Sequence, residues 1–236
     1  MAINLIRRLV TNIGNENDSR REEWVRRSLA DISNGFTILD AGAGQQRYRP
    51  YCSHLNYVSQ DFCQYMGNDN NAGLHSAEWN TKNIDLVSDI TNIPIQDSSF
   101  EAILCTEVLE HVPDPIDAIR EFYRLLKPNG ILIVTVPFCS LTHMAPYHFF
   151  SGFNKYFFEH HLPKIGFDVL EISPNGDFNE FLAQEIRRIP SLYPKPSLMM
   201  SVSVGYLLRF LSKSKGRNLI SNDLACFGFH VRARKS

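Results

Sequence analysis

The first candidate for chemistry is a glycine turn that follows an apolar segment ending in an acid. Residues 38–50 read ILDAGAGQQRYRP, in which Asp40 is followed by Gly42 and Gly44. Glycine permits a tight turn and lets a ligand approach the backbone closely, and such turns bind nucleotides at the carboxyl edge of parallel sheets. The dinucleotide fingerprint needs a third glycine where this chain has Arg47. The turn alone therefore counts against NAD and leaves another adenosine cofactor, or none, as alternatives.

Three histidines are the candidates for acid–base chemistry. His143 and His148 lie in PFCSLTHMAPYHFF, a proline-containing loop after an apolar run, and His111 lies in EVLEHV. A hydroxyl group that is to react as a nucleophile needs a base near neutral pH, and histidine titrates in that range. We therefore predict a catalytic or substrate-binding role for these three side chains. The alternative for each is a surface or capping histidine.

The composition is that of an ordinary globular protein without a strong overall charge. Of 236 residues, 44% are apolar and 21% are charged, and the net charge is −1, so no global field draws the chain to nucleic acid. The five cysteines are scattered without a CxxC pair, which argues against a disulfide framework and a structural zinc site. No run reaches the roughly 18 apolar residues that cross a bilayer. We expect a cytoplasmic, soluble protein that does not bind nucleic acid.

Strands and helices are predicted to alternate along most of the chain, which indicates a parallel sheet with right-handed crossovers. The run ILIVTVPF is typical of a central strand that is buried on both faces. Strands are expected over 36–44, 56–61, 84–89, 100–112, 131–138, 167–173 and 225–233, and helices over 19–33, 114–130 and 153–167. Between the last two strands, residues 178–222 are too many for a hairpin, so they predict an insertion or a lid.

Several motifs occur in an order that resembles a known family. Asp40-x-Gly42-x-Gly44, an acid that ends the next strand (Asp61), SDI, EVLEHVPDP and LKPNGILIVTVP follow one another along the chain. Together they resemble the class I S-adenosylmethionine-dependent methyltransferases, in a type 11-like group, over about residues 36–175. The resemblance implies an α/β, Rossmann-like fold with a seven-stranded, mostly parallel sheet, an antiparallel last strand and a lid insertion.

This resemblance also implies how the domain is organised. We expect a single methyltransferase domain over residues 1–236, with an N-terminal helical region at 1–35. The cofactor-binding half would be 36–138. The substrate half would be 139–236, with the insertion at about 178–222.

The cofactor implied by the resemblance is S-adenosylmethionine. Its predicted binding residues are Asp40, Gly42, Gly44, Asp61, Asp89, Ile90 and Glu107. Asp61 lies about 20 residues after Asp40, a spacing at which an acid accepts hydrogen bonds from ribose hydroxyls in related folds. Asp89 would accept from the adenine amino group, with the backbone of Ile90 nearby. The alternative is that Asp40 and Asp61 only cap helices or turns.

Two details of the motifs qualify this interpretation. Gln46 stands where the family usually has a third glycine, and we expect its side chain to point outward. Glu107, Glu110 and His111 form an ExxEH stretch similar to that of ubiquinone-biosynthesis O-methyltransferases, in which these residues help to bind a divalent cation. Because the same stretch is widespread in methyltransferases without a metal, we predict that no metal takes part.

The acceptor is predicted from resemblance and from aromatic residues. DAGAGQQRYRPYCSHLNYVSQDF is similar to bacterial methyltransferases of cell-surface glycan and lipid-linked saccharide pathways. We therefore expect a small-molecule acceptor, a hydroxyl of a sugar or of a lipid-linked precursor. The alternatives are a quinone or phenolic precursor and a non-catalytic S-adenosylmethionine-binding module; an NAD-dependent oxidoreductase is disfavoured by Arg47. A set of aromatic residues would stack on the acceptor or belong to the core: Phe149, Phe150, Phe153, Tyr156 and Phe157.

One apolar segment in the insertion has a basic end. PSLMMSVSVGYLLRFLSKSKGR, residues 196–217, is apolar over most of a helix circumference and carries Arg209, Lys213, Lys215 and Arg217 near its end. Such a helix is usually buried. The alternative is peripheral contact of residues 198–217 with an anionic membrane.

Overall fold

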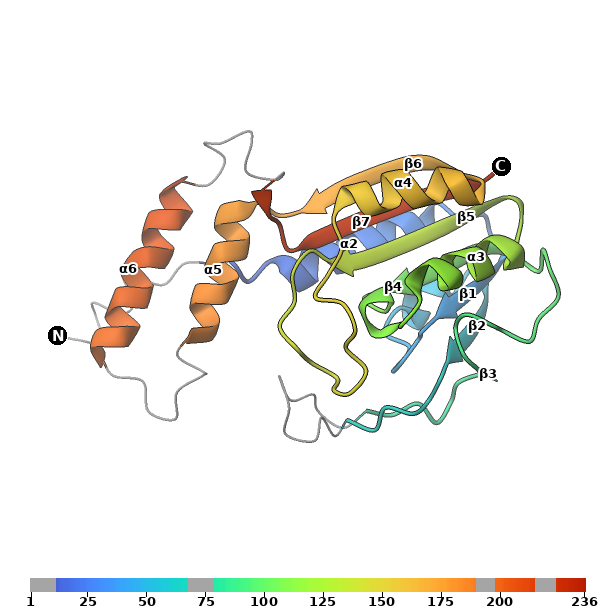
Figure 1. Ribbon diagram of the computed structural model, residues 1–236, viewed down its shortest axis with the longest axis horizontal. Coiled ribbons are helices and arrows are strands. Elements are labelled where there is room, and N and C mark those ends of the chain that lie inside the picture. The colour runs from blue at the N-terminus through green and yellow to red at the C-terminus, as the bar shows by residue number, and fades with distance from the viewer. Residues whose placement is uncertain (1–11, 68–78, 190–197, 215–223) are drawn as a thin grey trace. The chain divides into compact units, whose positions relative to one another are not determined.

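The computed structural model describes residues 12–67, 79–189, 198–214 and 224–236 (Figure 1). The chain divides into two compact units. The larger unit comprises Glu22–Ser173 and Gly228–Ser236, and the smaller one comprises Met1–Arg21 and Pro174–Phe227. Within the described ranges, no helix combines the length and apolar character that a bilayer crossing requires.

The larger unit is built on one seven-stranded sheet with the order β3-β2-β1-β4-β5-β7-β6. Neighbouring strands from β3 to β5 are parallel, and β7 is antiparallel to β5. This confirms the predicted sheet with its antiparallel last strand. The strands are β1 (Thr37–Ala41), β2 (Asn56–Asp61), β3 (Leu86–Val87), β4 (Phe100–Thr106), β5 (Leu126–Pro137), β6 (Phe167–Asn175) and β7 (Gly228–Lys235).

Helices cover both faces of this sheet, with α3 and α4 in front of it and α2 behind it in Figure 1. Val25 and Leu29 of α2 (Asn17–Ala30) belong to one core cluster with Ile38, Leu104 and Ile133 of the sheet. Side chains alternate between the two faces of a strand, so the intervening strand residues face the opposite layer. That layer contains α3 (Pro115–Leu125) and α4 (Lys155–Ile165). Burial on both faces explains why the central strands are continuously apolar.

The start of β5 differs from the sequence expectation. The stretch 127–130 was expected to end a helix that runs to Gly130, but α3 ends at Leu125 and the strand begins at Leu126. Leu126 pairs with Phe100 and Ile131 pairs with Ala102, so the intervening residues form a bulge in the ladder. Leu126 is fully buried, and its burial favours an extended residue over one more helical turn.

The strand β3 is also shorter than the expected 84–89. Only Leu86 and Val87 pair with β2, and Val87 is exposed. A short strand at the edge of a sheet offers few unpaired backbone groups to another chain.

The smaller unit contains a helical pair within the predicted insertion. It consists of α5 (Phe178–Arg188) and α6 (Leu198–Ser214). Ala183 of α5 packs with Leu208 and Leu211 of α6 and with Ile13. Asp177 begins α5 with a capping box, in which its side chain accepts from the amide of Glu180.

Candidate functional site

The glycine turn and the end of β2 are joined by hydrogen bonds at the carboxyl edge of the sheet. The Gly44 amide donates to Oδ2 of Asp61 at 3.0 Å, and the Cys63 amide donates to Oδ1 of the same carboxylate at 2.8 Å. The Gly42 amide donates to Oε1 of Gln60 at 3.2 Å. Gly44 and Asp61, each predicted as a cofactor-binding residue, are in direct contact, because β1 and β2 are parallel neighbours.

Backbone strain is concentrated at the same edge. Gly42 and Gly44 have φ values of 71° and 51°, which glycine adopts without steric cost. Among the described residues, four non-glycine residues with positive φ follow β1, β2 and β4 or lie on the loop after β5: Gln46, Cys63, Glu107 and Met144. A non-glycine residue in this region costs on the order of 1 kcal/mol and persists where the surrounding structure imposes it. Strain gathered in this way is typical of functional sites.

The turn is narrow where the glycines lie. A Cβ at Gly42 would come within 2.6 Å of the methyl groups of Val108, and a Cβ at Gly44 would come within 2.5 Å of the Trp79 ring. Neither Val108 nor Trp79 was identified from the sequence, because no motif links them to the turn. A narrow glycine turn beside a buried acid fits the predicted use, which is to hold a nucleoside without phosphates.

The side chain of Asp40 points toward Tyr57 of β2. Its carboxylate is buried and accepts a hydrogen bond from Tyr57 Oη at 2.5 Å. Burial raises the pKa of Asp40 to about 7, the hydrogen bond from Tyr57 opposes this rise, and the Asp61 carboxylate adds to it. Burial also raises the pKa of Tyr57. In this arrangement Asp40 fixes the end of β1 against β2, and its predicted contact with a cofactor stays a prediction.

The three other predicted cofactor residues lie in different environments. Asp89 is exposed, and its Oδ1 accepts from the amide and the hydroxyl of Thr91, both at 2.8 Å. Ile90 beside it is buried. Glu107 accepts at Oε1 from Thr135 Oγ1 at 2.9 Å, so its carboxylate is held against β5.

The three predicted catalytic histidines come together. The ring centroids of His111 and His143 are 4.7 Å apart, those of His143 and His148 are 4.8 Å apart, and those of His111 and His148 are 5.8 Å apart. His111 follows β4, and the other two lie on the loop between β5 and α4. The sequence predicted the residues but not their contact, which depends on how this loop folds back.

Hydrogen bonds orient the rings in this cluster. His111 donates from Nδ1 to the carbonyl of Tyr147 at 2.5 Å, and His143 pairs through Nδ1 with the carbonyl of Leu141 at 2.9 Å. Because a carbonyl accepts, Nδ1 carries the proton in both rings. Burial is the main cause that lowers the pKa of His111 to about 4, and burial followed by the proximity of His143 lowers the pKa of His148. His111 is therefore neutral at pH 7.

A carboxylate lies beside the histidines. Glu110 Oε1 is 3.8 Å from His111 Nε2, and one ligand atom each of Glu110, His111 and His143 lies within 4.8 Å of the others. This group has His143 in the place of Glu107, so it differs from the ExxEH set. That no metal takes part stays a prediction.

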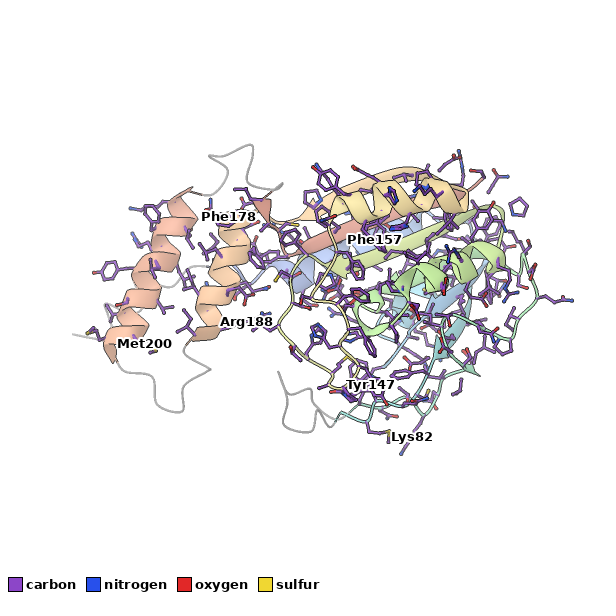
Figure 2. All side chains as sticks on the ribbon, in the orientation of Figure 1. Lys82, Tyr147, Phe157, Phe178, Arg188 and Met200 are labelled. Atoms are coloured by element: carbon purple, nitrogen blue, oxygen red, sulfur yellow. The ribbon has the colours of Figure 1, made fainter. Side chains whose placement is uncertain are left out.

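The aromatic residues divide between core and surface. Phe153 is buried, and its ring centroid is 4.8 Å from that of Phe157 on α4. Phe149 and Tyr156 are exposed. Figure 2 shows Tyr147 on the loop after β5, away from Phe157. The predicted wall is thus a core cluster with an exposed margin and not one continuous surface.

Comparison with known proteins shows similarity to methyltransferases. Residues 39–134 match the family model described as a methyltransferase domain. The ubiquinone biosynthesis O-methyltransferase of Histophilus somni (strain 2336) is 32% identical over 124 residues, which cover 47% of this chain and 45% of the relative. The ubiquinone/menaquinone biosynthesis C-methyltransferase of Klebsiella pneumoniae (strain ATCC 700721) is 28% identical over 176 residues, which cover 71% of this chain and 66% of the relative. The chain thus spans about half to two thirds of the length of these relatives.

Solved structures agree with the sheet order. A SAM-dependent methyltransferase from Archaeoglobus fulgidus superposes with a TM-score of 0.56 at 16% identity, over 92% of this chain and 94% of that one. At this identity the likeness shows the fold alone. The family match over residues 39–134, the sheet order and the glycine turn together make this chain similar to the class I S-adenosylmethionine-dependent methyltransferases, whose cofactor is S-adenosylmethionine.

Proposed function

We propose that this protein methylates a hydroxyl of a small phenolic acceptor of the quinone-precursor type. The observation that carries the proposal is the cluster of His111, His143 and His148 at the edge of the sheet that also bears the glycine turn. The names of the relatives support the aromatic class, because both act in quinone biosynthesis. The sugar hydroxyl expected from the sequence has no such support and becomes the second acceptor class to test.

The residues at the edge of the sheet supply binding and orientation. The narrow turn at Gly42 and Gly44, the Asp61 carboxylate and the buried Ile90 would line the cofactor site. S-adenosylmethionine, when bound, supplies an electrophilic methyl group. The protein then has to align the acceptor oxygen for in-line attack.

The histidine cluster would remove the acceptor proton. A phenol has a pKa of about 10, so at neutral pH a base is needed to make its oxygen nucleophilic. His148 suits this role, because its lowered pKa keeps it neutral and able to accept a proton. His111 acts as a positioning residue, since its bond to the Tyr147 carbonyl holds the loop that carries His148.

The test is a product assay with purified protein, S-adenosylmethionine and two acceptor panels, catechols with hydroxybenzoates and free sugars with nucleotide sugars. Mass spectrometry would detect the methylated product, and a coupled assay would detect S-adenosylhomocysteine. We expect product from a phenolic acceptor and a loss of at least tenfold in kcat for His148→Asn, with cofactor affinity unchanged. The wild-type pH profile should have an acid limb below pH 6.5, since protonation of His148 removes the base.

Other outcomes would replace this proposal. Product from sugars alone would assign the acceptor to the glycan class. Cofactor binding without product from either panel would favour a non-catalytic S-adenosylmethionine-binding module.

We further propose that α6 makes peripheral contact with an anionic membrane. Its exposed side includes Met199, Tyr206 and Phe210, which recur at helical spacing and lie opposite the buried Leu208. The exposed Lys213 lies in the last turn, where it would face lipid phosphates. Of the basic residues expected to assist, Lys215 and Arg217 lie outside the described residues. An apolar stripe with a basic end favours an anionic bilayer surface over a neutral protein groove.

A further inference from the structure

Trp79 packs directly on the glycine turn. Three atoms of its six-membered ring lie between 2.5 and 3.4 Å from the place that a Cβ of Gly44 would occupy. Tyr65, which is buried, supports the indole from the side, with ring centroids 5.9 Å apart and an interplanar angle of 66°. The indole itself is half-buried. The edge of the indole at Cζ2 thus lies against the backbone that is best placed to receive a cofactor.

The segment that carries Trp79 is attached to the turn. Gln46 Nε2 donates to the carbonyl of Asn83 at 2.5 Å. At the turn, the Asp61 carboxylate accepts a hydrogen bond from the Gly44 amide, and Trp79 lies against the α carbon of Gly44. A carboxylate and an indole therefore meet at one residue. Gln46, which replaces the usual third glycine, supplies a bond to Asn83, four residues after Trp79.

The combination of an acid and an aromatic ring has a clear chemical preference. Tryptophan attracts a cation placed over its ring, and the attraction grows when water is excluded. S-adenosylmethionine carries a positive charge on its sulfur, whereas the product S-adenosylhomocysteine has a neutral thioether there. A site wall made of indole would bind the first more strongly than the second, without a further buried charge.

We propose that Trp79, supported by Tyr65, recognises the positive charge of the bound cofactor and thereby favours S-adenosylmethionine over S-adenosylhomocysteine. This inference rests on the proposed function and adds a specificity-determining residue to its site. It also gives the half-buried indole a role in turnover. Once the sulfur has lost its charge, the product loses this contact and leaves more readily.

The test is a calorimetric titration of three ligands against wild type, Trp79→Leu and Trp79→Phe. The ligands are S-adenosylmethionine, S-adenosylhomocysteine and an analogue that carries an ammonium group in place of the sulfonium. Leucine keeps an apolar side chain but has no ring, whereas phenylalanine keeps a ring. Thermal melting checks that each variant is folded.

We expect Trp79→Leu to weaken both charged ligands by roughly 3- to 30-fold, the range of a cation–π contact. The affinity for S-adenosylhomocysteine should change by less than twofold, and Trp79→Phe should retain most of the wild-type preference. Charged ligand should also quench the tryptophan fluorescence of the wild type and leave that of Trp79→Leu unchanged. The chain has two tryptophans, so the comparison assigns the signal to Trp79.

Two results would overturn the inference and can be told apart. An equal loss for charged and neutral ligands would make Trp79 a steric wall, and no loss would mean that Trp79 does not contribute to binding; either result would leave the proposed function intact. A wild type that binds none of the three ligands would reject the cofactor site, and the proposed function with it.

Discussion

The carboxyl of Asp40 departs from the ordinary chemistry of an aspartate. Because burial raises the pKa of its carboxyl from 3.8 to about 7, the folded protein holds a proton there that the unfolded chain releases. The contribution of Asp40 to the free energy of unfolding therefore falls as the pH rises from about 4 to 7. The Asp40→Asn variant lacks this titration while its amide oxygen can still accept from Tyr57.

We therefore expect Asp40→Asn to gain stability relative to wild type as the pH is raised, by up to about 4 kcal/mol at pH 8 compared with pH 4. Urea unfolding at several pH values would measure this difference. The lowered pKa of His111 makes the protein more stable as the pH rises from about 4 to 6.5. Because His111 is present in both proteins, this effect cancels in the difference between them. A stability difference that does not vary with pH would contradict a protonated Asp40 in the fold.

A matched pair of glycines separates backbone strain from close contact. Gly44 and Gly35 both have positive φ values, 51° and 80°, but only Gly44 has a neighbour where a Cβ would lie. Gly35→Ala should cost about 1 kcal/mol of stability, the cost of a left-handed alanine. Gly44→Ala should cost more and weaken S-adenosylmethionine binding at least tenfold, because it displaces Trp79. Thermal melting and calorimetry would measure both effects, and equal losses for the two variants would argue against a tight turn.

At the scale of elements, α6 presents two apolar faces. Leu208 and Leu211 pack within the smaller unit. Met199 and Phe210 are 81% and 67% exposed, although contact of apolar side chains with water is unfavourable. We expect the double variant Met199→Ser with Phe210→Ser to reduce cosedimentation with phosphatidylglycerol vesicles at least fivefold, because apolar area drives interfacial binding.

The control for this experiment is Val87→Ser on β3, which removes an equally exposed apolar side chain from the larger unit. It should leave vesicle binding unchanged. Binding of the wild type to neutral and anionic vesicles alike would remove the role of Lys213. No binding to either would mean that another partner, or none, covers this face.

At the scale of the whole molecule, every residue of the candidate site belongs to the larger unit. The strands that lead into and out of the smaller unit are close at their ends, since the Phe227 amide donates to the Asn175 carbonyl at 2.8 Å. Replacement of residues 177–225 by an Asn-Gly turn should therefore close β6 and β7 as a hairpin. We expect this variant to fold and to bind S-adenosylmethionine within threefold of wild type, while vesicle binding is lost.

Circular dichroism and calorimetry would test the shortened chain. An unfolded product would mean that the smaller unit is needed for folding, and a folded product that does not bind the cofactor would mean that the smaller unit contributes to the site. The single domain with its boundaries at 35 and 138 stays a prediction.

The sequence alone determined which segments form most of the strands and where the glycine turn lies. Both depend on local patterns: apolar runs such as ILIVTVPF specify buried strands, and glycine at 42 and 44 is needed for the positive φ values found there. The acid that ends β2 could be paired with this turn because parallel neighbours end at the same edge. The predicted helix end at Gly130 was wrong, because Leu126 is buried and already pairs with β4 as the first residue of β5.

Only the tertiary structure decided which side chains meet at the site. The contacts of Trp79 with Gly44, of Tyr57 with Asp40 and of His111 with the loop histidines join residues that are far apart in the chain. They lie on turns and loops, where no periodic pattern records the partner. The exposed face of α6 was likewise undecided, because an apolar helix has the same sequence whether one or both of its faces are covered. Packing chooses between these arrangements, and packing is a property of the whole folded chain.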